Sequence, residues 1–437
     1  MLRRAGALAG AVLVALTTAC QSGPGTPAGA TPSPAPNSAS ALSTSTTTSP
    51  GTPPATATKP KTATPVAPRR NPGGLSDDQT VGQLFMVYAY GSGAQSATPA
   101  QRAANLALFG VATPAEVVRR WHPGGIILIN TNNLDPQRPS LSSGNVDSPA
   151  QIAALTAGLQ RAALADTGLP LLIATDQEGG RVQRIRDGVT ARPPQRALAR
   201  TSPAALTCSY YGLGRQLRAL GVNQDFAPDA DVVTTSAGVI GDRSFGPDPV
   251  LDATLVRAAV TGLQAAGVLA TLKHWPGHGS TDTDSHAALA VIRQSAAAWR
   301  AQDRAPFAAS APVAAGIMVG HLALPAVDPT GRPATFSPTL VSGLLRGELG
   351  YQGLIISDSL FMAPARAAGT PAAVALLALR AGIDLQLEPV SLPGSATALL
   401  TALRTDPAAR ALIQAAAGRV LAAKAKLGRP PVPRPGC

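Results

Sequence analysis

Residues 267–286 read GVLATLKHWPGHGSTDTDSH. It opens with an apolar run that ends at Leu272 and then changes into a polar loop of histidine, aspartate, glycine and proline. A short apolar run bounded in this way is typical of a strand buried on both faces, as in a parallel sheet. Three of the chain's five histidines lie on the loop, which indicates a reaction site directly after a buried strand.

The same alternation of a short apolar run and a helix-like segment continues along the chain. It predicts strands at 84–88, 125–130, 171–175, 222–227, 269–273, 316–320, 353–357 and 384–387. Helices are predicted at 114–121, 149–164, 203–220, 248–266, 294–309, 337–349, 371–381 and 407–425. Alternating strands and helices predict an α/β fold with a parallel sheet, and eight repeats favour a closed (β/α)₈ TIM-type barrel over an open doubly wound sheet.

Polar side chains follow several of these predicted strands. Strand ends in a (β/α)₈ barrel converge on one face, where the following loops build the active site. The sequence therefore predicts one pocket from residues that lie far apart in the chain, namely Asn130, Asn132, Asp176, Glu178, Asp229, Asp231, Lys273, His274, His321 and Asp358.

The loop after residue 272 offers two kinds of chemistry. His274 and His278 have the spacing of a helical zinc site, but Pro276 and the neighbouring glycines argue against a helix there. Asp284 and His286 form a second pair, and in extended backbone their side chains would share one face. A carboxylate that holds one imidazole nitrogen leaves the other free to move a proton at neutral pH.

Four motifs together carry a resemblance to a known family. They are DQEGGRVQR at 176–184, DRSFG at 242–246, KHWPGHGSTDTDSH at 273–286 and IISDSLFM at 355–362. In this order they resemble glycoside hydrolase family 3, and specifically its N-acetyl-β-glucosaminidase branch, whose members act in peptidoglycan turnover. The resemblance covers residues 75–428 and implies a barrel enzyme that needs neither a metal nor an organic cofactor.

The resemblance also implies roles for single residues. Asp358 corresponds to the nucleophile, His286 to the general acid and base, and Asp284 to its orienting partner. Glu178, Gly179 and Gly180 are expected to shape a turn. The residues that correspond to the family's sugar-binding groups are Asp176, Arg184, Arg243, Lys273 and His274.

Several residues keep two interpretations open. Asp358 could instead cap the following helix, both arginines could form salt bridges at the rim, and Trp275 could either stack on a sugar or pack the loop. Ser359 stands where this branch more often has a second aspartate, and His278 has no assigned task. The segment 318–325 also departs from the common pattern. Three more residues lie at strand ends but match the family more loosely, namely Asp231, Met318 and His321.

The expected activity is that of a retaining, exo-acting β-N-acetylglucosaminidase on cell-wall fragments. Because a histidine base is neutral, phosphate could compete with water, so a phosphorylase or a β-glucosidase of the same family is the nearest alternative. An alternative from another class is a surface lipoprotein that binds carbohydrate without turnover. A metal-dependent hydrolase that uses His274, His278 and His286 is a third.

The chain's first residues resemble a bacterial lipoprotein signal. Arg3 and Arg4 precede an apolar stretch at 5–16 that is too short to span a membrane, and Cys20 follows small residues. We therefore expect a signal peptide at 1–20, acylation of Cys20, and an exported protein held at the membrane by this lipid. Residues 21–73 are rich in proline, serine, threonine and alanine and are expected to be a disordered linker. The catalytic barrel is expected at 74–428, before a proline-rich tail at 429–437.

The net charge of the chain bears on its binding partners, and its cysteines bear on a disulfide. The formal net charge of the chain is +12. Six basic residues and no acidic residue precede the barrel, so the remaining residues carry a net charge of +6. Basic residues are scattered without interleaved aromatic side chains, so we do not expect nucleic acid as a partner. The resemblance implies a carbohydrate partner, and we expect a monomer. Cys208 and Cys437 could form a disulfide, although sequence alone gives no geometry for it.

Overall fold

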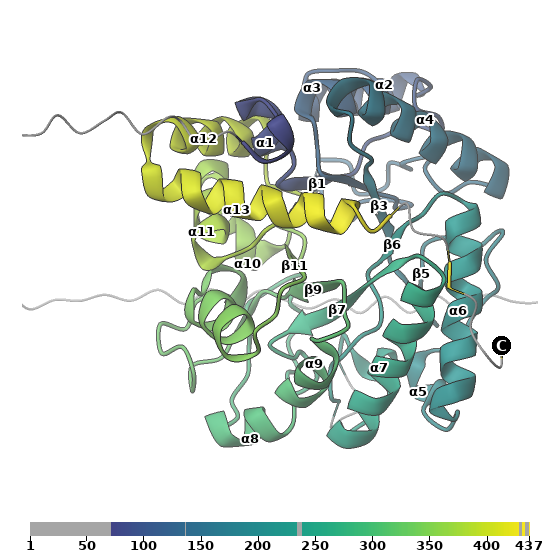
Figure 1. Ribbon diagram of the computed structural model, residues 1–437, viewed down its shortest axis with the longest axis vertical. Helices are drawn as coiled ribbons and strands as arrows, with labels where there is room; N and C mark the ends of the chain where they lie inside the picture. The colour runs from purple at the N-terminus through teal and green to yellow at the C-terminus, as the bar shows by residue number, and fades with distance from the viewer. Residues whose placement is uncertain (1–70, 136, 234–237, 428–430, 433–436) are drawn as a thin grey trace, which may run out of the picture. The chain divides into compact units, whose positions relative to one another are not determined.

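The structure of the chain is a computed structural model that describes residues 71–135, 137–233, 238–427, 431, 432 and 437 (Figure 1). The predicted signal peptide, the acylation of Cys20 and the linker up to residue 70 lie outside these residues. The described part begins three residues before the predicted barrel boundary. A 3₁₀ turn, η1 (Pro72–Gly74), follows Asn71, whose side-chain amide donates to Asp77 Oδ1 at 3.0 Å.

Eight parallel strands form one sheet in the order β11, β9, β7, β6, β3, β2, β1, β12. A parallel bridge between Ile356 and Leu385 joins the two outer strands, so the sheet closes into a barrel. Every strand overlaps a predicted one, which confirms the (β/α)₈ fold. Their bounds are β1 (Phe85–Val87), β2 (Gly125–Ile127), β3 (Leu172–Thr175), β6 (Gln224–Asp225), β7 (Leu269–Trp275), β9 (Gly316–Val319), β11 (Leu354–Ser357) and β12 (Gln386–Leu387).

Helices surround the barrel (Figure 1). Those that confirm predicted helices are α3 (Pro114–Trp121), α4 (Pro149–Thr167), α6 (Pro203–Ala219), α7 (Pro249–Ala265), the π-helix η4 (Thr339–Glu348), α11 (Pro371–Ala381) and α13 (Pro407–Lys424). Additional helices that the sequence pattern did not predict are α1 (Asp77–Gly82), α2 (Pro99–Phe109), α5 (Gln195–Leu198), α10 (Ala363–Arg366) and α12 (Leu392–Thr405), together with the 3₁₀ turns η2 (Gly241–Arg243) and η3 (Ala334–Phe336). Two small sheets pair β4 (Gln177–Gly179) with β5 (Val182–Gln183) in an antiparallel hairpin and β8 (Ala290–Val291) with β10 (Leu322–Ala323) in parallel.

The predicted helix at 294–309 is wrong as one continuous element. It is broken into α8 (Ala296–Ala301) and α9 (Arg304–Ser310), with Asp303 between them. Asp303 is fully buried, and its Oδ2 accepts a hydrogen bond from Ser280 Oγ at 2.9 Å. The break therefore places a carboxyl group under the loop that follows β7.

Helix starts follow a repeated local rule in this chain. Proline at the first helical position follows a side chain that accepts a backbone N–H, which is a favourable start for a helix. Asp248, for example, accepts hydrogen bonds from Val250 and Leu251 at the start of α7. Thr370 and Asp406 act in the same way before α11 and α13.

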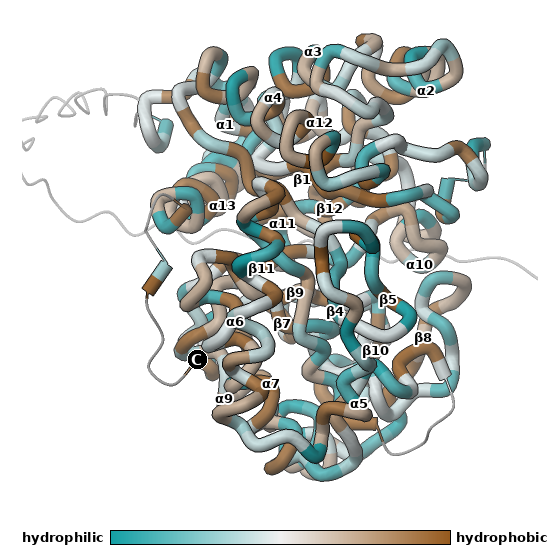
Figure 2. Tube along the Cα trace, turned by 90° about the vertical axis from the view of Figure 1, so that its right-hand side faces the viewer, coloured by the Kyte–Doolittle hydropathy of each residue, from teal (hydrophilic) through white to brown (hydrophobic). Residues whose placement is uncertain are grey.

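Apolar side chains fill the barrel interior and the layer between the strands and the helices. Met86, Leu172 and Ile356 are buried in one cluster, and a second, larger cluster contains the helix contacts. In Figure 2 the tube is brown along much of the central strands and teal along the hydrophilic β4–β5 hairpin. Among the helices of the described residues, none is long and apolar enough to cross a bilayer.

Trp275 belongs to this core and not to a sugar-binding surface. Its side chain is fully buried, and its ring centroid lies 5.7 Å from that of Trp299 and 5.4 Å from that of Phe307. The indole N–H donates to the carbonyl oxygen of Leu340 at 2.9 Å. The sugar-stacking interpretation of Trp275 is therefore wrong, and the packing interpretation is right.

Cys208, on α6, and Cys437 form a disulfide. Their Cα atoms are 5.4 Å apart, and 229 positions separate them in sequence. The pairing left open by the sequence is thus present, and it ties the end of the chain to α6.

Candidate active site

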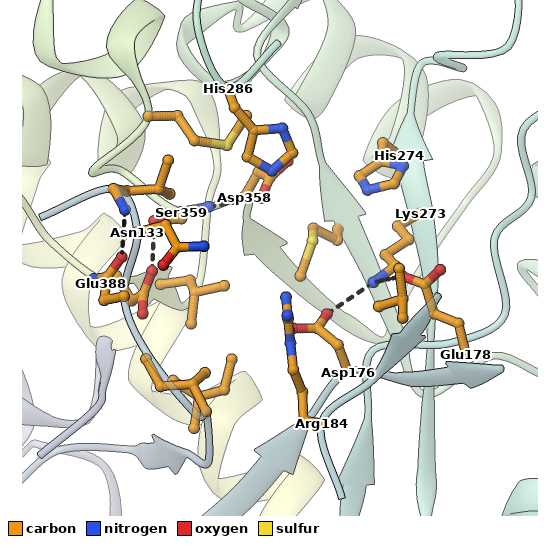
Figure 3. A pocket seen from close by; sticks show the side chains of 18 of the residues that line it. Asn133, Asp176, Glu178, Arg184, Lys273, His274, His286, Asp358, Ser359 and Glu388 are labelled. Atoms are coloured by element: carbon orange, nitrogen blue, oxygen red, sulfur yellow. Dashed lines mark hydrogen bonds and ion pairs between the residues drawn. The ribbon is translucent and has the colours of Figure 1, made fainter. Parts of the chain in front are cut away.

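A cavity of about 310 Å³ opens where the barrel strands end. All but one of the predicted catalytic and sugar-binding residues contribute to its wall, and Figure 3 shows most of them converging on one space. The convergence predicted from strand ends is therefore present. The predicted residues on the wall are Asp176, Arg184, Arg243, Lys273, His274, His286 and Asp358.

Asp358 directly follows β11 and is held by backbone contacts. Its N–H donates to the carbonyl oxygen of Val319 at 2.9 Å, and its Oδ1 accepts the N–H of Ser359 at 2.8 Å. Helix α10 begins only at Ala363, with Met362 as its N-terminal flanking residue, so the helix-capping interpretation of Asp358 is wrong. The strand end presents a fixed carboxylate to the cavity.

The charge state of Asp358 suits a nucleophile. Burial tends to raise the pKa of its carboxyl group, but nearby positive charge on His274, His321 and His286, with the Ser359 N–H, outweighs burial. The pKa is therefore held below its ordinary value, and Asp358 is ionised at neutral pH.

Asp284 and His286 form the predicted pair, although through a turn and not through extended backbone. Asp284 Oδ1 lies 2.7 Å from His286 Nδ1 and also accepts the N–H of His286 at 2.9 Å. The backbone turns here because the N–H of Ala287 and of Ala288 both bond to the carbonyl oxygen of Asp284. The predicted contact is right, but the extended geometry is wrong.

This turn keeps His286 on the wall of the cavity that Asp358 also lines (Figure 3). His286 lines the cavity with Asp358, and its carbonyl oxygen accepts the N–H of Ala363 at the start of α10. Asp284 lies behind the imidazole. Burial tends to raise the pKa of Asp284, but the N–H groups and charge of His286 outweigh burial and lower it. An ionised Asp284 fixes Nδ1 as the protonated nitrogen, which leaves Nε2 for proton transfer.

His278, which had no task in the sequence, supports the loop that carries this pair. Its ring is buried, with Nε2 2.8 Å from Ser285 Oγ and Nδ1 2.7 Å from Thr281 Oγ1. Burial lowers the pKa of His278 to about 4, so the ring is neutral. Together with the contact from Ser280 to Asp303, these bonds hold the loop at three points.

The opposite part of the wall is an ionic network around Lys273. Lys273 Nζ lies 2.8 Å from Asp176 Oδ1 and 2.6 Å from Glu178 Oε1. Glu178 also bonds to Arg243, with 2.7 Å between Oε2 and Nε. Beyond the turn that the sequence predicted for Glu178, this residue therefore joins Lys273 to Arg243.

Both arginines form the ion pairs that the sequence left open, yet both also line the cavity. The Arg243 Nε lies 3.1 Å from Asp229 Oδ2, and the residue is 8% exposed. Arg184 is more exposed, and its Nε lies 3.5 Å from Asp176 Oδ2. Sugar binding by Arg184 and Arg243 stays a prediction.

His274 depends on Asp231, which the sequence placed at a strand end but outside the core set. Asp231 Oδ2 lies 2.8 Å from His274 Nδ1, and its Oδ1 accepts the N–H of both His274 and His278. Burial opposes both charges, but His274 lowers the pKa of Asp231 to about 2, and Asp231 raises the pKa of His274. Asp231 therefore anchors both ends of the segment 274–278.

We expect Asp231→Asn to destabilise the protein by about 2 kcal/mol at pH 6, since the amide keeps an acceptor but loses the charge. The pKa of His274 is higher in the folded protein than in the unfolded chain. The charge on His274 therefore adds its full share to the free energy of unfolding below the unfolded pKa of about 6.5, and this share is lost as pH rises through the folded pKa. The loss on substitution should thus be smaller at pH 9 than at pH 6. Urea unfolding at both pH values measures the difference.

Asp242→Asn is the matched control, because Asp242 is half-exposed and its contact with Arg181 is long at 3.7 Å. We expect this change to alter stability by less than about 0.5 kcal/mol at either pH. An effect of Asp231→Asn that is the same at pH 6 and pH 9 would contradict the charged pair.

The three loop histidines do not form a metal site. Within the described ranges, the one group of three side chains with metal-capable atoms within 4.8 Å of one another is Asp229, Asp231 and His274. Asp231 already bonds to His274, and Asp229 already bonds to Arg243. The guanidinium group of Arg243 thus supplies the positive charge beside Asp229. The ring nitrogens of His278 face hydroxyl groups, as given above, so the trio of histidines is not brought together as ligands.

Comparisons with known proteins agree with this geometry. Residues 78–423 match the family model described as the glycosyl hydrolase family 3 N terminal domain. The chain is 38% identical over 304 residues to a β-hexosaminidase of Nitrosomonas eutropha, an alignment that covers 67% of this chain and 82% of the relative. A β-hexosaminidase of Bordetella avium is 40% identical over 289 residues, covering 64% and 77% of the two chains.

Solved structures give the same result. A family 3 β-N-acetylglucosaminidase from Paenibacillus superposes with a TM-score of 0.70 at 36% identity; the match covers 81% of this chain but only 63% of that longer one. A β-N-acetylhexosaminidase from Beutenbergia cavernae superposes with a TM-score of 0.68 at 30% identity, covering 80% of this chain and 99% of the other. The family model spans the barrel and every strand end that supplies the cavity. The resemblance carried by the four motifs is thus confirmed, and the chain belongs to glycosyl hydrolase family 3.

Proposed function

We propose that the protein is an exo-acting, retaining β-N-acetylglucosaminidase that removes terminal N-acetylglucosamine from cell-wall fragments. The observation that carries this proposal is the meeting of Asp358 and His286 in one cavity, beside the network of Lys273 and Asp176, with Asp284 holding the His286 ring from behind (Figure 3). A carboxylate nucleophile, a proton-transfer group and a set of hydroxyl-binding side chains are the parts that double displacement at a sugar requires.

The reaction proceeds in two displacements. In the first, an Asp358 oxygen attacks the anomeric carbon while His286 Nε2 gives its proton to the departing glycosidic oxygen, which leaves an ester between the sugar and Asp358. In the second, His286 accepts a proton from water, the water oxygen attacks the same carbon, and Asp358 is released. Two inversions retain the β configuration.

The side chains across the cavity explain how a sugar can be held during this chemistry. Asp176 accepts hydrogen bonds from hydroxyl groups, whereas Lys273, His274 and Arg184 can donate to sugar oxygens. Because Lys273 is already paired with Asp176 and Glu178, these groups are ordered before the substrate arrives. Ordered polar groups lower the entropic cost of binding and favour one sugar orientation.

The acetamido sugar is proposed because the relatives and solved structures named above are β-hexosaminidases or β-N-acetylglucosaminidases. These comparisons do not favour the β-glucosidase, the phosphorylase or the non-catalytic binder. One experiment compares aryl N-acetyl-β-glucosaminide with aryl β-glucoside, each with and without phosphate. We expect faster turnover of the acetamido substrate and free β-N-acetylglucosamine as the first product. Absence of its turnover would defeat the proposal, and a sugar phosphate as the main product would change the reaction class.

We also propose that the protein is exported and anchored to the membrane by a lipid on Cys20, so that the enzyme faces the cell-wall space. The support is the sequence at 3–20, where basic residues, an apolar stretch and small residues precede the cysteine. In a bacterial host, the full chain should enter the membrane fraction and incorporate a labelled fatty acid, whereas Cys20→Ser should incorporate none. Equal labelling of both proteins would contradict acylation at Cys20.

A further inference from the structure

Glu388 is an acidic residue on the cavity wall that belongs to none of the four motifs. It follows β12, is 6% exposed, and lines the cavity together with Asp358 and Ser359. Its φ of 44° lies in the left-handed region, which is unfavourable for a residue other than glycine. Such backbone strain persists where the surrounding structure imposes it, and it is concentrated at functional sites. Residue 388 is therefore a candidate for a direct role in the cavity.

Among the carboxylates that line the cavity, Asp176 and Glu178 form ion pairs with Lys273, whereas no ion pair joins Glu388 to a cation within the described residues. Within the part of the chain that the structure describes, Glu388 makes one side-chain hydrogen bond, in which its Oε2 accepts from Ser359 Oγ at 2.6 Å. Its Oε1 has no such partner there. Because Oε1 is not among the fully buried polar atoms, it is accessible from the cavity, where a bound molecule can donate a hydrogen bond to it.

The partner at position 359 accounts for the departure from the family pattern in the IISDSLFM motif. An aspartate in place of Ser359 would put a second carboxylate at about hydrogen-bond distance from Glu388, where like charges repel. The serine hydroxyl donates instead. Ser359 and Glu388 thus form one unit, in which the carboxyl group comes from β12 and not from the residue after the nucleophile.

The position of this unit shows which part of a substrate it meets. Figure 3 places Glu388 and Ser359 on one side of the cavity and Asp176, Glu178 and Lys273 on the other. A sugar whose anomeric carbon lies at Asp358 has hydroxyl groups around its ring, and the Lys273 side can reach only some of them. A hydroxyl that faces the Glu388 side would find an acceptor with a free oxygen.

We propose that Glu388 is a specificity-determining residue that accepts a hydrogen bond from a hydroxyl group of the terminal sugar, on the side of the cavity opposite Lys273. This inference rests on the proposed glycosidase function. A site built to bind a hydroxyl rejects an analogue that lacks it, because the buried acceptor is then left without a partner. Substrates with this hydroxyl removed or substituted should therefore be turned over poorly.

The test is a comparison between enzyme variants and substrate analogues. Wild type, Glu388→Gln and Glu388→Leu are assayed on aryl N-acetyl-β-glucosaminide and on its 3-deoxy, 4-deoxy and 6-deoxy analogues with the same leaving group. For the parent substrate we expect Glu388→Leu to lower kcat/KM about 10- to 100-fold, and Glu388→Gln to lower it less. On the deoxy analogue that lacks the hydroxyl bound by Glu388, each variant should have nearly the same kcat/KM as wild type, because that hydrogen bond is already absent. On the other two analogues, each variant should lose as much kcat/KM relative to wild type as it loses on the parent substrate.

Ser359→Ala is the matched control for an indirect effect through the nucleophile, because it keeps the N–H that bonds to Asp358. If Glu388 acted only through Ser359, this control would reproduce the loss of Glu388→Leu on all analogues alike. Thermal unfolding excludes a folding defect: burial raises the pKa of Glu388 to about 7, and Glu388→Gln removes the unfavourable charged form but keeps an oxygen that can accept from Ser359, so its melting temperature should equal or exceed that of wild type. An equal loss on every deoxy analogue, or a clearly lower melting temperature of Glu388→Gln, would overturn the proposal.

The outcome also separates this inference from the proposed function. If wild type acted on the aryl β-glucoside and not on the acetamido parent, the proposed function would fail, but the same comparison could be made with deoxyglucosides. If wild type acted on the acetamido parent and no analogue interacted with Glu388, the proposed function would stand and the role of Glu388 would be refuted.

Discussion

Asp358→Ala should reduce kcat/KM on aryl N-acetyl-β-glucosaminide by about 10⁴-fold or more, because no covalent intermediate can form. The pKa of Asp358 is held below its ordinary value, its backbone N–H donates to Val319, its carboxylate accepts the N–H of Ser359, and it lines the same cavity as His286. In the wild type, attack by this carboxylate replaces one difficult displacement with two easier ones. Steady-state kinetics with an activated aryl leaving group measures the loss without a requirement for acid catalysis.

Asp242→Ala serves as the matched control, since Asp242 is half-exposed and does not line the cavity. It should retain near-wild-type kinetics. Addition of azide or formate to Asp358→Ala should restore some turnover, because a small anion can occupy the space of the missing carboxylate. Near-wild-type activity of Asp358→Ala would refute the nucleophile assignment.

His286→Ala should give the second large effect, and its size should depend on the leaving group. General acid catalysis contributes about 10²- to 10⁴-fold when the leaving group needs a proton. For a poor leaving group such as a second sugar, we therefore expect kcat/KM to fall by that range. For a nitrophenyl leaving group, which departs as a stable anion, kcat/KM should fall far less. A plot of log kcat/KM against the leaving-group pKa should be steeper for the variant than for wild type.

Asp284→Asn tests the supporting part of the pair. The amide keeps contact with the ring but loses the charge that stabilises the protonated imidazole. We expect a smaller loss than for His286→Ala, with a changed pH dependence. His278→Ala, by contrast, removes loop contacts but no proton-transfer group.

An equal loss of kcat/KM in His286→Ala for good and poor leaving groups would argue against the role of His286 as the general acid.

The fold could be predicted from sequence because each barrel strand is a short apolar run between polar segments. Runs such as Leu354–Ser357 are buried on both faces, so their composition alone marks them. The unpredicted helix α12 (Leu392–Thr405) begins with a Leu-Pro-Gly sequence that reads as a turn, and its start depends on Ser391, which accepts the N–H of Gly394. The break at Asp303 depends on a contact with Ser280 more than 20 positions away, which local patterns do not contain.

The site could be predicted only where its residues lie in recognisable motifs. Asp358, His286 and Lys273 belong to such motifs, and all three line the cavity. The network that orders them joins distant segments: Asp231 meets His274 across 43 positions, and Glu178 meets Arg243 across 65. Glu388 belongs to none of the motifs, but it directly follows the predicted strand 384–387, so the strand-end rule could have placed it on the same wall as Asp358, and the sequence prediction missed it.

The most direct test of the account is to identify the residue that carries the covalent intermediate. A 5-fluoro N-acetyl-β-glucosaminyl fluoride slows breakdown of the glycosyl-enzyme more than its formation, so the intermediate accumulates. Digestion and tandem mass spectrometry of the trapped protein then locate the sugar. The account predicts a single N-acetylglucosaminyl-type adduct on Asp358, which His286→Ala retains longer than wild type. An adduct on another carboxylate such as Glu178 or Glu388, or rapid turnover with no adduct at any time, would contradict it.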